Sequence, residues 1–191
     1  MDRVVADVFG YHALQLGLPE LPALEANRMP HRWLATSEML SRPVPAANAR
    51  GLAAIEDWPQ PTLVTDFAAL PFPASSLDLV VLPHTLELSA DPHATLREVE
   101  RVLVPEGRVV ICGFNPASLW GLRQRRARLF ERLGLGQPFL PQAGEFIGYW
   151  RLRDWLRLLS FEVETGRFGC YRPAVRSEKW LRRFAWMDQA G

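Results

Sequence analysis

The block from residue 77 to residue 113 constrains the fold more than any other part of the sequence. Two apolar runs, Leu77–Leu82 and Arg108–Gly113, flank a helical pattern over Pro92–Leu103 whose apolar residues recur every three or four positions. Asp91 precedes that pattern as a predicted N-cap, and Pro92 takes the first helical position. Pro105–Gly107 is expected to form a turn before the second run. A strand, a helix and a second strand in this order predict a βαβ unit in a parallel sheet.

Weaker patterns extend this alternation along the chain. Helices are expected at Asp2–Gly10, Leu21–Arg28, Ala117–Leu133 and Tyr149–Leu159, and strands at His12–Gly17, His31–Thr36, Thr62–Asp66 and Phe161–Thr165. Short apolar strands that alternate with helices predict a mostly parallel sheet with helices on both faces.

Composition narrows the class of protein. A chain of 191 residues that is 48% hydrophobic fits one domain with a sizeable core, and its net charge of +1 creates no field that would attract nucleic acid or a membrane surface. The two cysteines, Cys112 and Cys170, lack the spacing of a metal site, which predicts a reduced, cytoplasmic protein without a bound metal. No signal peptide pattern and no apolar run long enough for a membrane span occur.

The expected topology indicates where a ligand would bind. In open parallel sheets, ligands lie beyond the carboxyl ends of the strands. The segments that follow the predicted strands are Gln15–Gly17, Thr36–Glu38, Asp66–Phe67, Leu82–Thr85 and Gly113–Pro116.

One continuous stretch also resembles a known family. DFAALPFPASSLDLVVLPHTLELSADPHATLREVERVLVPEGRVVICGFNP, residues 66–116, is similar to the second half of class I S-adenosylmethionine-dependent methyltransferases. The type 11 group, which includes the ubiquinone and menaquinone biosynthesis enzymes, shows the same order of motifs. The resemblance implies a Rossmann-like three-layer α/β/α sandwich with a mostly parallel sheet of six or seven strands. It also implies S-adenosyl-L-methionine as cofactor and a small-molecule or lipid-like methyl acceptor.

The resemblance assigns roles to several residues. Asp66 would accept a hydrogen bond from the adenine amino group and Phe67 would pack on the adenine, or they are a capping aspartate and a core phenylalanine. Leu82 and Pro83 would form the floor near the methyl group. His84 would orient the cofactor or act as general base, and the alternative is a structural histidine that bonds a loop carbonyl.

The first half departs from the family pattern. Gln15 and Gly17 occupy the place of a glycine-rich cofactor loop, and Glu38 is the nearest candidate for the acid that would hold the ribose. A non-catalytic binding or regulatory protein on a methyltransferase fold is therefore the alternative function. We expect one methyltransferase-like domain over residues 1–191, either truncated at its C-terminal end or built on a smaller sheet.

A basic helix face offers a second binding surface. Five arginines lie between Arg123 and Arg132. They form either a solvated face or a docking site for an anionic ligand. Stacking aromatics and RNA-binding motifs are absent there, which disfavours nucleic acid as the partner.

Overall fold

The computed structural model describes residues 2–37, 62–116 and 146–169. It divides into two compact units, residues 1–113 and 114–191, which are described separately. Glu38 and the Arg123–Arg132 segment lie outside the described residues, so both assignments stay predictions. The expectation of one domain over the whole chain also stays a prediction.

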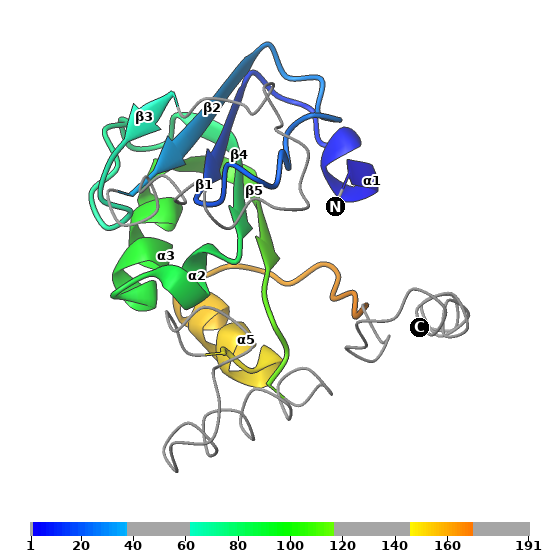
Figure 1. Ribbon diagram of the computed structural model, residues 1–191, viewed down its shortest axis with the longest axis vertical. Helices are drawn as coiled ribbons and strands as arrows, with labels where there is room; N and C mark the ends of the chain where they lie inside the picture. The colour runs from blue at the N-terminus through cyan, green and yellow to red at the C-terminus, as the bar shows by residue number, and fades with distance from the viewer. Residues whose placement is uncertain (1, 38–61, 117–145, 170–191) are drawn as a thin grey trace, which may run out of the picture. The chain divides into compact units, whose positions relative to one another are not determined.

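The first unit is built on a five-stranded sheet in the order β3-β2-β1-β4-β5. The strands are β1 (His12–Leu16), β2 (His31–Thr36), β3 (Leu63–Val64), β4 (Leu77–Pro83) and β5 (Leu103–Cys112). Every pair is parallel, and the arrowheads of β1 and β2 point toward the edge where α2 begins (Figure 1). The expected Rossmann-like parallel sheet is confirmed, although the described residues contain five strands rather than six or seven.

Both faces of the sheet are buried at its centre. On one face Ala13, Leu79 and Val81 pack with Val5 and Val8 of the N-terminal segment, which includes the helix α1 (Asp2–Ala6). The residues that alternate with them on the same strands are fully buried as well: Leu14, Leu16, Val80 and Leu82. A strand that is apolar on both sides needs cover on both sides, which is the physical basis of the three-layer arrangement.

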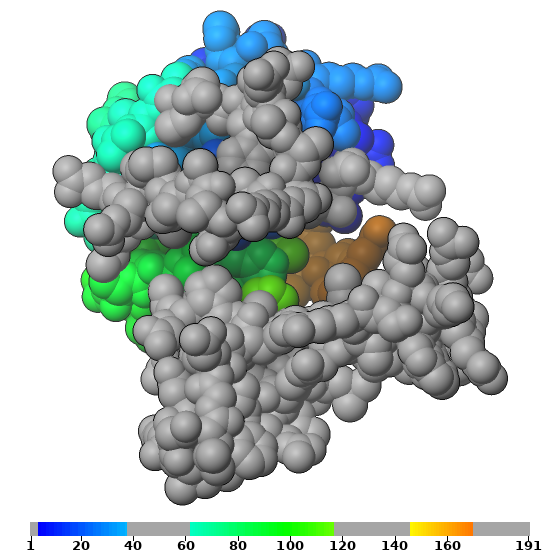
Figure 2. All heavy atoms as spheres, in the orientation of Figure 1, coloured from blue at the N-terminus to red at the C-terminus, as the bar shows by residue number. Residues whose placement is uncertain are grey.

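The residues of β2 become more buried from the start of the strand to its end. His31 and Arg32 are exposed, and the segment around them lies at the surface in light blue (Figure 2). Leu34 and Ala35 are buried near the other end of the strand. The carboxyl end of the sheet is therefore the better packed end at this strand.

The helix predicted after β4 forms as expected. α3 (Pro92–Val102) begins after Asp91, whose side chain accepts a hydrogen bond from the Ala94 N–H at 3.0 Å. Its buried face contains Leu96, Val99 and Val102. A short helix, α2 (Thr85–Leu88), precedes it and lies beside it (Figure 1).

The prediction of a turn at Pro105–Gly107 is wrong, because these residues lie inside β5. Leu77 pairs with Leu103 and Leu79 pairs with Arg108, so β5 accommodates the additional residues as an irregularity of register. Glu106 adopts a φ of 64° there. The residues before and after Pro105–Gly107 therefore belong to one continuous strand, β5, with a bulge.

The prediction of a helix at Leu21–Arg28 is also wrong, since these residues form successive turns. Buried Asn27 links these turns to the N-terminal segment. Its Nδ2 donates to the carbonyl oxygens of Val5 and Val8 at 2.7 and 3.2 Å, and its Oδ1 accepts from the Met29 N–H at 2.9 Å.

The second unit contains the helix α5 (Tyr149–Leu158), as predicted, with Leu156 buried. The helix ends where Ser160 turns into a left-handed conformation with φ of 60°, and the Phe161 N–H bonds the Leu156 carbonyl at 2.9 Å. Phe161–Thr165 is not a strand, contrary to prediction. Alternation of apolar and acidic residues is not sufficient for a strand, which also needs a neighbouring backbone to pair with.

Asn27→Ala should lower the free energy of unfolding by about 1–3 kcal/mol, because the carbonyls of Val5 and Val8 and the Met29 N–H lose their buried partner. Glu25→Ala is the matched control, since Glu25 is exposed on the same segment and should cost under about 0.5 kcal/mol. Urea unfolding of both variants measures the difference. Equal midpoints would contradict a structural role for the Asn27 amide.

Candidate functional site

The candidate site lies where the order of strands reverses. Strands are added outward on one side from β1 to β2 and β3, and on the other side from β4 to β5. In such sheets the crevice at the carboxyl ends of the two central strands is the ligand site. Here those ends are Leu16–Gly17 on β1 and Pro83–His84 on β4.

One side-chain hydrogen bond ties these two ends together. The buried Thr85 hydroxyl donates to the Leu16 carbonyl oxygen. Gly17, next in the chain, has a φ of 90° and donates its N–H to the Ala35 carbonyl at 2.8 Å. A Cβ at residue 17 would lie 3.1 Å from the Thr85 hydroxyl, so both the conformation and the space favour glycine.

The structure places Gln15 inside the fold. Its side chain is 3% exposed. Nε2 donates to the carbonyls of Leu18 and Leu21 at 3.0 and 2.7 Å, and Oε1 accepts from the Ala23 N–H at 2.9 Å. This side chain therefore shapes the loop after β1 through direct bonds to its backbone.

Asp66 and Phe67 follow β3, at the same edge of the sheet. Asp66 is exposed, and its Oδ1 accepts a hydrogen bond from the Ala68 N–H at 2.9 Å. Phe67 is buried. Hydrogen bonding connects the next turn to α3, because Glu98 Oε1 accepts from the Leu70 N–H at 2.8 Å. Arg101 forms an ion pair with Glu98 at 2.7 Å.

His84 follows the buried Leu82 and Pro83 and is the N-cap of α2, with φ of 56° and ψ of 15°. A left-handed conformation is uncommon for a residue other than glycine. The backbone N–H of His84 donates to the Cys112 carbonyl at 2.8 Å, which holds the end of β4 against the end of β5. Its ring Nδ1 lies 2.8 Å from Glu87 Oε2, one helical turn along α2.

The environment of His84 favours its charged form. Hydrogen bonds of the ring to the side chains of Cys112 and Glu87 raise its pKa from 6.5 to about 9, against the opposing effect of burial. The Glu87 side chain is 7% exposed and that of His84 is 18% exposed. At neutral pH the pair is therefore an imidazolium held by a largely buried carboxylate.

The predicted site residues that the structure describes thus lie in or after strands that end at the same edge of the sheet. They are Gln15 and Gly17 at the β1 end, Asp66 and Phe67 at the β3 end, and Leu82, Pro83 and His84 at the β4 end. Sequence reasoning missed the participation of Glu87 and Cys112. The His84-x-x-Glu87 spacing was a local signal for the pair, whereas the contact with Cys112 depends on strand register.

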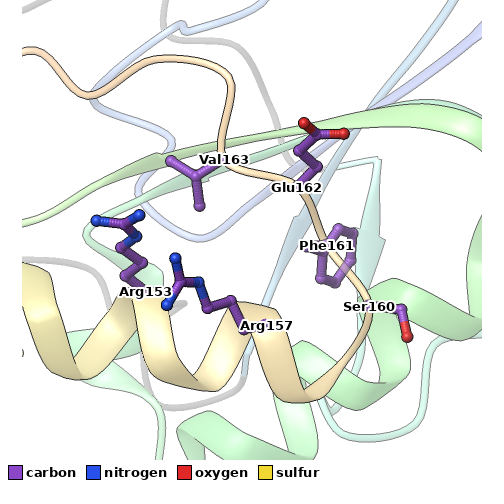
Figure 3. A pocket seen from close by; sticks show the side chains of 6 residues that line it. All are labelled: Arg153, Arg157, Ser160, Phe161, Glu162 and Val163. Carbon is purple, nitrogen blue, oxygen red and sulfur yellow. The ribbon is translucent and has the colours of Figure 1, made fainter.

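The second unit has a separate pocket of about 370 Å³, lined by Arg153, Arg157, Ser160, Phe161, Glu162 and Val163 (Figure 3). None of the predicted site residues lines it. The Arg153 guanidinium also lies 5.6 Å from the centre of the Trp150 ring. Within the described residues, no group of three or more histidine, cysteine, aspartate or glutamate side chains could hold a metal ion, and no helix is long and apolar enough to cross a membrane.

Comparison with known proteins shows what this chain is similar to. A family model described as "Methyltransferase domain" matches residues 37–111. The fold of a SAM-dependent methyltransferase from Thermotoga maritima, described as a possible histamine N-methyltransferase, superposes with a TM-score of 0.54 at 20% identity, over 84% of this chain and 68% of that one. The resemblance to the methyltransferase family is confirmed over residues 37–111, and the fold is that of SAM-dependent methyltransferases.

Two curated relatives match parts of the chain. The uncharacterized protein YafS of Escherichia coli (strain K12) is 44% identical over 94 residues, which are 49% of this chain and 36% of that protein. A malonyl-[acyl-carrier protein] O-methyltransferase of Halorhodospira halophila (strain DSM 244 / SL1) is 41% identical over 58 residues, 30% of this chain and 20% of that protein. The chain therefore covers well under half the length of either relative.

Glu87→Gln should bring the titration midpoint of His84 down from about 9 toward 6.5, because the ring loses its anionic partner. The raised pKa also means that the pair stabilises the fold fully below pH 6.5 and that this contribution is lost as the pH rises through about 9. The variant should show a weaker pH dependence, because the hydrogen bond of the ring to the Cys112 side chain remains.

NMR titration of the histidine ring protons measures the midpoint, with His84→Gln used to assign the signal. Glu100→Gln, an exposed position on α3, is the control and should leave the His84 titration unchanged. A midpoint near 6.5 in the unmodified protein would contradict the ion pair.

Proposed function

We propose that this chain binds S-adenosylmethionine at the carboxyl edge of the sheet and transfers its methyl group to a small-molecule or lipid-like acceptor. The observation that carries the proposal is the reversal of strand order between β1 and β4, with Asp66 and His84 following strands that end at that edge. The match of residues 37–111 to a methyltransferase domain supports the same function.

The residues at this edge fit the cofactor. The exposed Asp66 carboxylate uses Oδ1 for the Ala68 N–H, and a carboxylate oxygen can accept more than one hydrogen bond, so it suits an adenine amino group. Gly17 leaves room that a Cβ would fill, beside the Thr85 hydroxyl. In the proposed site Asp66 and Phe67 hold the adenine end of the cofactor. Leu82 and Pro83 form the floor. Gln15 and Gly17 shape the opposite wall. Glu38 is proposed to hold the ribose.

S-adenosylmethionine supplies an activated methyl group on a sulfonium, so the protein contributes mainly positioning and the exclusion of water. Fixed walls serve this purpose: the Gln15 side chain ties the loop after β1, and the Thr85–Leu16 bond fixes the two central strand ends. Nothing in this chemistry requires a metal ion or a nucleophilic triad.

We propose that His84 orients an anionic acceptor and does not act as a general base. A ring whose pKa is about 9 already carries its proton at neutral pH, and a base must be unprotonated to act. An acceptor such as a carboxylate is ionised at neutral pH and needs no base. The 41% identity over 58 residues to a protein named as a malonyl-[acyl-carrier protein] O-methyltransferase supports an acceptor of this kind.

A non-catalytic binding or regulatory protein is the second candidate function. The observation that favours it is the connection over residues 17–30, where turns replace the helix that would follow a cofactor loop. Calorimetric titration with S-adenosylmethionine and S-adenosylhomocysteine separates the two candidates. Micromolar dissociation constants support the enzyme, and no binding to the folded protein at millimolar ligand contradicts it.

Asp66→Ala should weaken binding of S-adenosylhomocysteine about 5- to 150-fold, which corresponds to the loss of about 1–3 kcal/mol from one hydrogen bond to a charged acceptor. Glu100→Ala removes an exposed carboxylate elsewhere in the same unit and should leave the affinity unchanged. Calorimetry on both variants tests the assignment. Unchanged affinity in Asp66→Ala would exclude Asp66 from the adenine site.

A further inference from the structure

The turn that follows β3 is bonded to an ion pair on α3. Glu98 and Arg101 lie about one helical turn apart, and Nε and Nη2 of Arg101 donate to the two oxygens of the Glu98 carboxylate at 2.9 and 2.7 Å. Two parallel hydrogen bonds of this kind fix the plane of a guanidinium as well as its position. The hydrogen bond from Arg101 lowers the pKa of Glu98, so both members of the pair are charged at neutral pH.

The ion pair bonds both backbone groups of Leu70. Glu98 Oε1 accepts from the Leu70 N–H at 2.8 Å, and Arg101 Nη2 donates to the Leu70 carbonyl at 3.1 Å. The same nitrogen donates to the Phe72 carbonyl at 2.9 Å. The Leu70 side chain is buried, so packing holds the residue whose backbone the ion pair also holds. Leu70 is therefore the point at which α3 fixes the turn.

Local hydrogen bonds carry this constraint from Leu70 back to Asp66. The Ala69 N–H donates to the Asp66 carbonyl at 3.1 Å, and the Ala68 N–H donates to Asp66 Oδ1 at 2.9 Å. The Thr65 hydroxyl donates to the Ala69 carbonyl at 3.2 Å. Within the part of the chain that the structure describes, no hydrogen bond uses Asp66 Oδ2. The turn therefore presents an exposed carboxylate oxygen whose place depends on its attachment to α3.

We propose that Arg101 is a positioning residue for recognition of the adenine amino group. Through Leu70 it holds the turn from which Asp66 Oδ2 accepts a hydrogen bond from that amino group. Glu98 holds the Arg101 guanidinium in the plane that this requires. Arg101 acts through the turn and is assigned no contact with the cofactor. The inference rests on the proposed binding of S-adenosylmethionine at this edge of the sheet, and it names the element that sets the base specificity of the site.

The test compares the affinities of S-adenosylhomocysteine and S-inosylhomocysteine for the full chain by calorimetry. The second ligand carries a carbonyl oxygen in place of the adenine amino group, so it offers an acceptor to a carboxylate that needs a donor. We expect the unmodified protein to favour S-adenosylhomocysteine at least about tenfold, the scale of one hydrogen bond to a charged group. Arg101→Ala should reduce that ratio to about threefold or less, because Asp66 is no longer held in place.

Further variants separate positioning from a loss of stability, which would weaken both ligands equally and leave their ratio unchanged. Arg97→Ala removes an exposed arginine from the same helix and should keep the ratio of the unmodified protein. Arg101→Lys keeps a positively charged donor and should recover part of the ratio. Glu98→Gln keeps an acceptor for the Leu70 N–H but loses the charge that orients Arg101, so its ratio should also fall. Melting curves establish that each variant is folded.

A measurement without ligand tests the same connection. Hydrogen exchange followed by NMR should show faster exchange of the Ala68 and Ala69 amides in Arg101→Ala than in Arg97→Ala, while the amides of α3 stay protected. Either an unchanged ligand ratio or unchanged exchange in Arg101→Ala would overturn the role of Arg101 and leave the proposed function standing. Equal affinity of the unmodified protein for the two ligands would overturn it as well, because Asp66 would then not read the amino group. No binding of either ligand by the folded, unmodified protein would overturn both proposals.

Discussion

The parallel pairing of β1 with β4 is the interaction on which the rest of the first unit depends. Ala13, Leu14 and Gln15 pair with Leu79, Val80 and Val81, and the apolar residues of both strands are almost completely inaccessible. The further strands lie on either side of this pair. The connections that follow β1 and β4 therefore lead away in opposite directions and leave a crevice at the carboxyl ends of the two strands. The hydrogen bond from the Thr85 hydroxyl to the Leu16 carbonyl then links the two strand ends. This bond sets where a ligand could approach the backbone.

Two buried amides compensate for a helix that the fold lacks. Between β1 and β2 the chain turns repeatedly, and Gln15 bonds the backbone of these turns, while Asn27 links them to the carbonyls of Val5 and Val8 before β1. Each amide both donates and accepts, so one side chain can pair carbonyl and N–H groups from different turns. The consequence for function is a loop after β1 whose shape is held by side chains. A glycine-rich loop obtains its shape from backbone freedom, which explains why only Gly17 is needed here.

The sequence predicted the parts of the fold that depend on local chemistry. Asp91 and Pro92 mark the start of α3 because an N-cap and a first-turn proline act within one helical turn. The bulge in β5 escaped prediction because Pro105–Gly107 has the composition of a turn, and only pairing with β4 shows that the strand continues. The same limit applies to the site: His84 and Glu87 are three residues apart, whereas Cys112 joins them through the register of two strands.

The two ends of the sheet edge carry groups of opposite charge, and this difference indicates how a bound ligand would be oriented. The Asp66 end offers an exposed carboxylate, which suits a donor such as an amino group. The β4 end offers a protonated imidazole beside a buried carboxylate, and its N–H groups can donate to an anion. Burial disfavours a cation, and the hydrogen bonds of the ring to Cys112 and Glu87 oppose that effect at His84. Recognition of an anionic acceptor at this end would therefore depend on both Cys112 and Glu87, because the hydrogen bonds of the ring to both side chains raise the pKa of His84.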